Sequence, residues 1–353
     1  MAHATAANEG GRTMEPAEFQ KLFAKVHAEL ARVVIGQERA VEHLLVAVFG
    51  GGHVLLTGMP GLGRTLLVKT LGEALGLEYR RIQFTPDLLP TDIVGAEVLE
   101  RNREGERRFH FFKGPVFANL VLADEINRSP ARTQSALLEL MQERQITTGG
   151  QTYRLPKPFV LVATQNTVES EGVWPLGEAQ ADRFMLCIEQ FYPDEDAEGR
   201  MLDVTTGTRR IQTQKVADPE AVVAMQNLAR EVPVVPSVKQ FALAIVRATR
   251  PGAEGGGDGS ADIRLGASPR AAQAILMGAK VLALARGRTH VSKSDVIEIA
   301  PSVLTHRLIV DFRAQAQGRD ARFIVERILQ HARRRALPEV SAWTRELIKG
   351  IEA

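Results

Sequence analysis

Short apolar runs alternate with amphipathic segments over the first 192 residues, and amphipathic segments alone follow them. Uninterrupted apolar runs of this kind are typical of strands that are buried on both faces of a parallel sheet. Because helical segments separate the runs, the pattern predicts an α/β fold with a doubly wound parallel sheet of five strands. The expected strands lie at residues 54–56, 79–84, 119–123, 159–163 and 184–188.

Beyond residue 192 the pattern has helical periodicity and shows no further buried strand. It predicts an all-α domain with helices at 195–206, 220–230, 239–249, 269–286 and 293–304. Glycine and acidic residues at 251–261 indicate a flexible surface loop. The expected organisation is a disordered tail at 1–14, an α/β domain at 15–192 and a helical domain at 193–353.

Two predicted hairpins interrupt the α/β domain. Residues 95–99 and 107–112 are strand-like and flank a charged stretch, which predicts a hairpin that projects from the domain. Residues 146–154 contain the pair Gly149-Gly150, which is typical of a tight hairpin turn.

The composition is that of a soluble globular protein, with 44% hydrophobic and 24% charged residues among 353. A formal net charge of only +2 argues against a general attraction to nucleic acid or to anionic membrane. The single cysteine, Cys187, excludes an internal disulfide framework and fits a reducing cytoplasm, where we expect the protein to work. No apolar run is long enough to span a membrane, and no signal-peptide region is expected.

A glycine-rich loop follows the first predicted strand and leads directly into a helix. The backbone N–H groups of such a loop close around an anion, and the helix N-terminus adds the positive end of its dipole. The loop matches the P-loop pattern G-x-x-x-x-G-K-[ST], which we favour over a plain glycine turn. Thr65 is expected to ligate a divalent metal. The residues expected to bind nucleotide here are Gly58, Met59, Pro60, Gly61, Leu62, Gly63, Arg64, Thr65 and Leu66.

Arg64 departs from this pattern, which has lysine at its position. Lysine is a compact cation between the β- and γ-phosphates, whereas the planar guanidinium of arginine is larger and fixed in shape. Nucleotide binding could therefore survive while the geometry for hydrolysis is lost. The sequence is compatible both with a natural variant of slow turnover and with an engineered change.

Asp124 and Glu125 stand at the C-terminal end of the third predicted strand, where open α/β sheets bind ligands. Strands commonly end in acidic residues, but this pair lies about sixty residues after the P-loop. We therefore expect Asp124 to hold the Mg²⁺ of ATP, directly or through water. Glu125 is expected to polarise the water that attacks the γ-phosphate.

Three other segments could serve a nucleotide or a nucleic acid. The apolar turn at 33–37 could hold a flat base, although plain packing of a helix end explains its pattern as well. Arg270 follows Ser268-Pro269 at the start of a helix, from which it could reach a phosphate. The basic run Arg333-Arg334-Arg335 is either a nucleic-acid contact or a solvated helix face, and we favour the latter.

Together these motifs resemble the AAA+ ATPases, and the connecting segments resemble the MoxR family among them. The resemblance covers about residues 19–308. Its specific segments include Arg81-Ile82-Gln83-Phe84-Thr85-Pro86-Asp87, Ala123-Asp124-Glu125-Ile126-Asn127-Arg128, Ala163-Thr164-Gln165-Asn166, Asp182-Arg183-Phe184 and Gly266-Ala267-Ser268-Pro269-Arg270.

The resemblance implies a role for each matching residue. Residues 58–65 would be Walker A, and Asp124-Glu125 would be Walker B. Asn166 would be sensor 1, Arg183 an arginine finger inserted into a neighbour's site, and Arg270 the sensor 2 of a helical lid. The adenine pocket would be lined by Val33, Val34, Ile35, Gly36 and Gln37.

The resemblance also implies a hexameric ring, with both hairpins facing its central pore. MoxR proteins are similar to chaperones that remodel or mature partners, often together with proteins that carry a von Willebrand factor A domain. We therefore expect a cytoplasmic ATPase that uses ATP and Mg²⁺ to act on a protein client. One alternative is an ATP-binding assembly switch in which Arg64 makes hydrolysis negligible. A DNA-directed motor is a further alternative, against which the near-neutral charge counts.

Overall fold

The computed structural model describes residues 12–101, 107–148, 150–166, 172–207, 211–252 and 261–336. Its centre is a five-stranded parallel sheet, as the sequence predicted, and the structure gives its strand order as β2-β5-β8-β1-β9. The strands are β1 (Val54–Gly58), β2 (Tyr79–Gln83), β5 (Leu120–Asp124), β8 (Val160–Thr164) and β9 (Leu186–Gln190). Each observed strand lies within two residues of its predicted place.

Alternate residues of the central strands enter two separate hydrophobic cores. In β5, Leu120 and Leu122 belong to one core, whereas Val121 and Ala123 belong to the other. Successive side chains of a strand point to opposite faces, so a strand buried on both sides needs an apolar residue at every position. This explains why the sequence shows continuous apolar runs in place of an alternating pattern.

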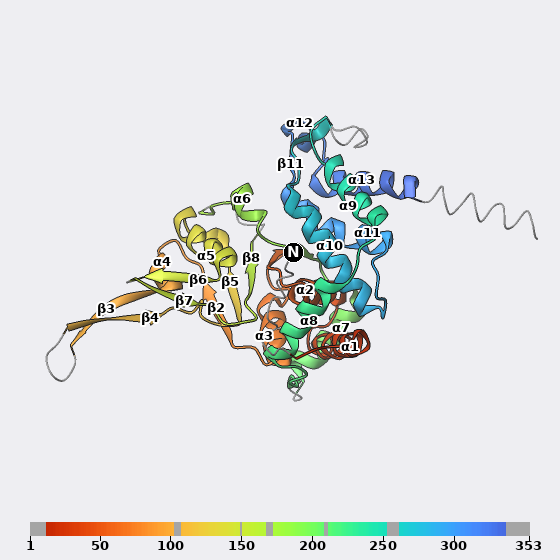
Figure 1. Cartoon of the computed structure of the whole chain (residues 1–353). Helices are drawn as coiled ribbons and strands as arrows, with labels where there is room; N and C mark the ends of the chain where they lie inside the picture. The colour runs from red at the N-terminus through yellow and green to blue at the C-terminus, as the bar shows by residue number, and fades with distance from the viewer. Residues whose placement is uncertain are drawn as a thin grey trace, which may run out of the picture.

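The helices α1 (Pro16–Val33), α2 (Glu38–Phe49) and α3 (Arg64–Leu75) share one of these cores with the sheet (Figure 1). Phe19, Phe23 and Phe49 form an aromatic cluster between α1 and α2, with ring centroids 5.8–6.3 Å apart. Met14 packs into the same core, and residues 1–11 of the predicted tail lie outside the described residues.

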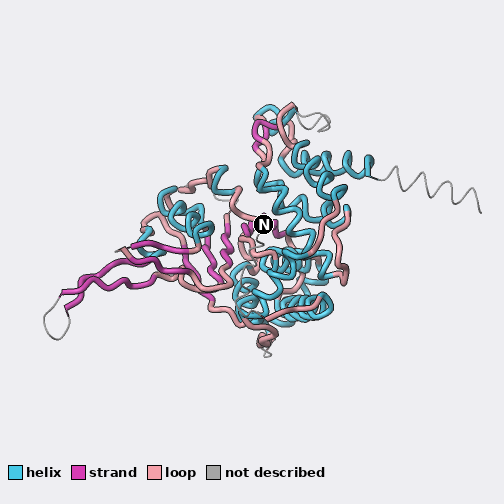
Figure 2. Tube along the Cα trace, in the orientation of Figure 1, coloured by secondary structure: helices cyan, strands magenta, loops and turns pink. Residues whose placement is uncertain are grey.

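The other core contains α4 (Pro90–Val94), α5 (Ala131–Glu143) and the ends of the two hairpins. One hairpin pairs β3 (Gly95–Arg101) with β4 (Arg107–Lys113), and the other pairs β6 (Gln145–Thr148) with β7 (Gln151–Arg154). Figure 2 shows the first hairpin extending far from the body. The rings of Phe111 and Tyr153 join the hairpins at 4.6 Å, and Phe109 is 73% exposed. Gly149 of the predicted turn lies outside the described residues.

The second half of the chain is mostly helical, as predicted, and covers the α1–α3 side of the molecule (Figure 1). It also contains a two-stranded sheet of β10 (Ile263–Leu265) and β11 (Ile309–Val310), which the sequence did not predict. Strands of two or three residues are too short to produce a readable period. The helices are α7 (Glu195–Thr206), α8 (Pro219–Glu231), α9 (Pro236–Ala248), α10 (Pro269–Ala285), α11 (Lys293–Leu304), α12 (Phe312–Ala316) and α13 (Ala321–Ala336).

Most of the predicted loop at 251–261 lies outside the described residues, as does the chain after residue 336. Arg333 and Arg334 are exposed on α13, which agrees with a solvated helix face. Within the described ranges, no helix has both the length and the apolar character that a membrane crossing requires.

Two histidines are buried as neutral side chains. The ring of His53 donates through Nε2 to the Met141 carbonyl at 3.3 Å and accepts the Leu161 N–H through Nδ1 at 3.0 Å. Burial lowers the pKa of His53 to about 4, with a smaller contribution from Arg144. Burial also lowers the pKa of His43 to about 4, and its Nδ1 lies 2.9 Å from the Ser302 hydroxyl.

We expect stability to fall as the pH decreases from 6.5 to about 4. In this window the unfolded chain binds protons at both positions and the folded chain does not, so the free energy of unfolding decreases by up to about 3 kcal/mol for each histidine. Urea unfolding at pH 7.5, 6 and 5 measures the slope. His53→Gln should make the slope shallower, while His290→Gln, at an exposed histidine, is the matched control. Equal slopes in all three proteins would contradict the assignment.

Candidate nucleotide site

Three neighbouring strands bring the predicted chemistry to one edge of the sheet. Strand β1 ends in the P-loop, β5 ends at Asp124, and β8, which lies between them, is followed by Asn166. The carboxyl ends of parallel strands share an edge, so these three segments meet there. The sequence predicted each segment separately, and the strand order brings them together.

The P-loop runs from Gly58 at the end of β1 to Arg64 at the start of α3. Gly63 has a φ of +74°, which favours glycine, and a Cβ there would meet no other atom within 4 Å. The backbone conformation, and not crowding, therefore requires glycine at this position. Open space above a curved backbone at a helix N-terminus is suited to an anion such as phosphate.

Arg64 turns back onto the loop that it follows. Its guanidinium donates to the carbonyl oxygens of Gly58, Met59 (3.1 Å) and Gln165 (2.8 Å). Gln165 immediately precedes Asn166, so the side chain joins the P-loop to the end of β8. Three carbonyl acceptors suit the forked donors of arginine, and a lysine ammonium would satisfy them in a different geometry.

Burial is the main influence on the pKa of Arg64. It lowers the pKa of the half-buried guanidinium, while the carboxylates of Asp124 and Glu125 act in the opposite direction. An arginine stays protonated under these conditions. Arg64 therefore places a fixed positive charge between the P-loop and the two carboxylates.

Asp124 is nearly buried and has a partner on each carboxylate oxygen. The Thr164 hydroxyl donates to Oδ1 at 2.7 Å, and Arg81 donates to Oδ2 through both Nε (2.9 Å) and Nη2 (2.6 Å). Thr164 also accepts the backbone N–H of Glu125 at 2.7 Å. These bonds hold the end of β5 between its two neighbouring strands.

Glu125 leaves the line of the strand with a left-handed backbone, at φ +57°. This conformation is uncommon outside glycine and is often found at functional sites. The carboxylate accepts a hydrogen bond from Gln83 Nε2 at 3.0 Å and another from Arg128 at 3.0 Å. Arg81 in turn donates to Gln83, so one network contains both carboxylates.

The site is suited to a magnesium ion that arrives with phosphates. Asp124 and the Thr65 hydroxyl would be the residues that hold it, since both carry the hard oxygen atoms that Mg²⁺ prefers. Across the ranges described above, no group of three or more His, Cys, Asp or Glu side chains could hold a metal alone.

A mainly apolar cavity lies beside the P-loop, between the α1–α2 connection and α7. Its lining includes Val33, Val34, Ile35, Gln37, Leu62, Gly63, Leu66, Pro193, Met201 and Thr205. Gly36 lets the connection approach α7 closely, because its φ is +75° and a Cβ there would lie 2.9 Å from that of Ala197. Four of the five residues predicted to line an adenine pocket, Val33, Val34, Ile35 and Gln37, line this cavity.

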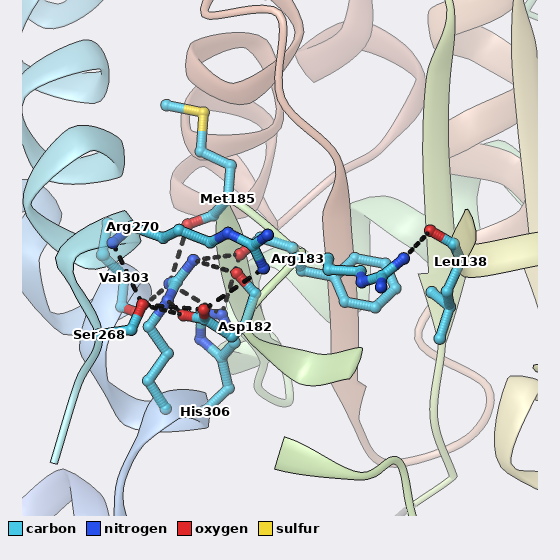
Figure 3. A network of polar contacts seen from close by, with 10 residues as sticks. Leu138, Asp182, Arg183, Met185, Ser268, Arg270, Val303 and His306 are labelled. Atoms are coloured by element: carbon cyan, nitrogen blue, oxygen red, sulfur yellow. Dashed lines mark hydrogen bonds and ion pairs between the residues drawn. The ribbon is translucent and has the colours of Figure 1, made fainter. Parts of the chain in front are cut away.

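Asp182 lies between Arg270 and Arg183. Figure 3 shows the Arg270 guanidinium beside the Asp182 carboxylate, whereas the Arg183 side chain points away from it toward Leu138. Arg183 donates to the Leu138 carbonyl on α5 at 2.6 Å, so in the single chain it is engaged internally. Arg270 lies 3.6 Å from Asp182, which also accepts from Ser268 at 2.8 Å. The sequence predicted both arginines as site residues but not the aspartate that connects them.

Arg307 is a further member of this group that sequence reasoning missed. It is buried, pairs with Asp182 at 2.9 Å and donates to the Phe184 carbonyl at 2.6 Å. Burial lowers the pKa of Arg307, while the Asp182 carboxylate acts to raise it. These contacts join the segment around Arg183 to the helical half of the chain. No local pattern marks Arg307 as part of this group, because Asp182 and Phe184 lie more than 100 residues away in sequence.

Arg81, Gln83 and Arg128 were also missed as site residues. Arg81 and Gln83 alternate on β2, so they share a face, and Gln83 pairs in register with Asp124. The alternation was visible in the sequence, but the position of β2 beside β5 was not.

The fold and the site define a P-loop ATPase, and comparisons with known proteins narrow the class. Residues 53–186 match the family described as "ATPase family associated with various cellular activities (AAA)", and residues 259–328 match the AAA lid domain. A crystal structure of a Cytophaga hutchinsonii protein, described as a candidate ATPase, is similar with a TM-score of 0.82 and 42% identity. The similar region covers 90% of this chain and 96% of the Cytophaga chain.

Curated relatives specify the family. Chaperone MoxR1 of Mycobacterium tuberculosis is 41% identical over 346 residues, which are 94% of this chain and 90% of that protein. Protein MoxR of Methylorubrum extorquens is 31% identical, over 83% of this chain and 89% of its own. The chain belongs to the MoxR family of AAA+ ATPases.

Proposed function

We propose that this protein binds and hydrolyses Mg²⁺-ATP in an oligomeric ring and uses the cycle to remodel or mature partner proteins. The observation that carries the proposal is the meeting of the P-loop, Asp124 and Glu125 at one edge of the sheet, where β1 and β5 end on either side of β8. The apolar cavity beside the P-loop supports adenosine nucleotides as the ligand.

The residues take separate roles in this proposal. Backbone N–H groups of residues 58–65 and the start of α3 hold the phosphates, with Thr65 and Asp124 beside the metal. Glu125 accepts the proton of the attacking water, and Asn166 orients that water. A bound Mg²⁺ would neutralise phosphate charge.

The ring part of the proposal concerns Arg183 and Arg270. Arg183 would leave the Leu138 carbonyl and reach the γ-phosphate held by a neighbouring subunit. Because Asp182 contacts Arg270 and precedes Arg183, movement of the lid would be transmitted to the finger. The name of the mycobacterial relative supports a chaperone-like role.

Mixing two inactive variants tests hydrolysis between subunits. Arg183→Ala alone should bind ATP normally and lose about 10³-fold in turnover, because the transition-state charge lacks its partner. Adding Glu125→Gln protomers should restore part of the activity, since each variant supplies what the other lacks. Phosphate release across mixing ratios measures this, with Arg247→Ala, on the exposed face of α9, as control. A mixture that never exceeds its parents would contradict the proposed role of Arg183.

The first alternative is an ATP-binding assembly switch with negligible hydrolysis. The contacts of Arg64 with three carbonyl groups favour this alternative, because they hold the P-loop in one conformation. Phosphate release by the assembled protein distinguishes the two. ATP-dependent assembly without turnover would support the switch.

A DNA-directed motor is the second alternative, and loss of DNA retention at moderate salt would count against it.

Clients can be sought with Glu125→Gln, which is expected to hold ATP and stay bound to them. A von Willebrand factor A domain protein is the first partner to test. Capture that requires ATP, and disappears with ADP, would support a client.

A further inference from the structure

Arg81 and Thr164 already occupy the two carboxylate oxygens of Asp124, the residue proposed to lie beside the metal. Both donors that Arg81 directs at Asp124 end on Oδ2, at 2.9 and 2.6 Å, while Thr164 takes Oδ1. Two charge-assisted hydrogen bonds to one oxygen satisfy its acceptor capacity. Asp124 therefore already has a cationic partner within the chain.

We propose that Arg81 is a displaceable counter-ion of Asp124 that competes with the divalent metal for this carboxylate. The proposal rests on the proposed Mg²⁺-nucleotide function. It adds that the metal's affinity is set by a residue of β2, outside both Walker motifs.

The burial of the two partners makes such an exchange feasible. The Asp124 side chain is only 12% exposed, so leaving its charge without a partner would be costly. The Arg81 side chain is 47% exposed, so it can turn into solvent at little cost. Arg81 thus satisfies the buried carboxylate of Asp124 and can withdraw from it.

The neighbouring strand residue provides a matched comparison. Arg80 is the same residue type on the same strand, but its side chain points to the other face and pairs with Glu78 at 3.0 Å. Its side chain is 60% exposed, and it forms no hydrogen bond or ion pair with Asp124 or Glu125. A change at Arg80 therefore alters charge and strand composition equally without touching Asp124.

Metal affinity is the direct test. Mn²⁺ is titrated into protein saturated with ADP, and free Mn²⁺ is followed by electron paramagnetic resonance. Removing a competing charged hydrogen bond should raise Mn²⁺ affinity about tenfold or more in Arg81→Gln, with wild-type affinity in Arg80→Gln. Arg81→Lys, which keeps the charge but not the fork, should lie between them.

Thermal unfolding separates this role from a purely structural one. Without metal, Arg81→Gln should have a lower Tm than wild type, and Mn²⁺ with ADP should raise its Tm by more than it raises that of wild type. A purely structural role predicts the lower Tm without metal but no larger rise in Tm on adding Mn²⁺ with ADP. Equal Mn²⁺ affinity in Arg81→Gln and Arg80→Gln would overturn this inference alone. If wild type binds neither Mn²⁺ nor ADP, the proposed function is overturned as well.

Discussion

Replacing Glu125 with glutamine is expected to lower ATP turnover by roughly two orders of magnitude or more while nucleotide binding persists. The amide cannot accept the proton of the attacking water, but it has the size of the carboxylate. It can still accept the bonds from Gln83 and Arg128 that hold the side chain in place. The backbone at residue 125 should also keep its left-handed conformation, since its N–H bond to Thr164 is unaffected.

Steady-state phosphate release and equilibrium binding of ATP measure the two quantities separately. Glu143→Gln, at the exposed end of α5, is the matched control and should behave as wild type. Unchanged turnover in Glu125→Gln would remove this residue from the mechanism. A parallel loss of binding would instead indicate that Glu125 supports the fold of the site.

Arg64→Lys is expected to raise kcat far more than it improves nucleotide affinity. The guanidinium is held by carbonyls of the P-loop and of Gln165, so its charge sits where the protein backbone places it. Transition-state stabilisation depends on placement, and a shift of about 1 Å can cost on the order of a hundredfold in rate. A lysine side chain carries the same charge as a compact group that can follow the phosphates.

The measurement combines steady-state kinetics with binding of a non-hydrolysable ATP analogue. Arg64→Gln removes the charge and should weaken binding, which controls for a general loosening of the loop. If Arg64→Lys improves affinity and leaves kcat unchanged, Arg64 acts only on the ground state. If neither quantity changes, this loop has adapted to arginine and the protein is an ordinary ATPase.

The strand, glycine loop and helix of residues 54–75 and the place of Asp124 at the end of β5 could be predicted from the sequence, because each depends on contiguous residues. Glycines with positive φ, an apolar strand and a helix start are all local features. The five strands were equally readable, since burial on both faces requires a continuous apolar run. The lid sheet of β10 and β11 was missed because its strands are too short to show a period.

Contacts between residues that are distant in sequence could not be predicted from the sequence. Arg81 lies beside Asp124 because β2 pairs with β5, and Arg64 reaches Gln165 because β1 pairs with β8. The internal contact of Arg183 and the link from Asp182 to Arg307 likewise required the tertiary structure. Arg64 shows the division most clearly: the sequence identified it as a departure, and the fold decided which groups it contacts.

The sequence by itself determined that nucleotide binding is the predicted function. The P-loop and the acidic pair each consist of consecutive residues, and their backbone conformation depends on local sequence. The tertiary structure decided which charged and polar groups surround these residues. It determines which cation faces each carboxylate and which carbonyl groups accept hydrogen bonds from Arg64. The physical reason is that backbone conformation follows from nearest neighbours, whereas strand order and lid packing bring together charges that lie far apart in the chain.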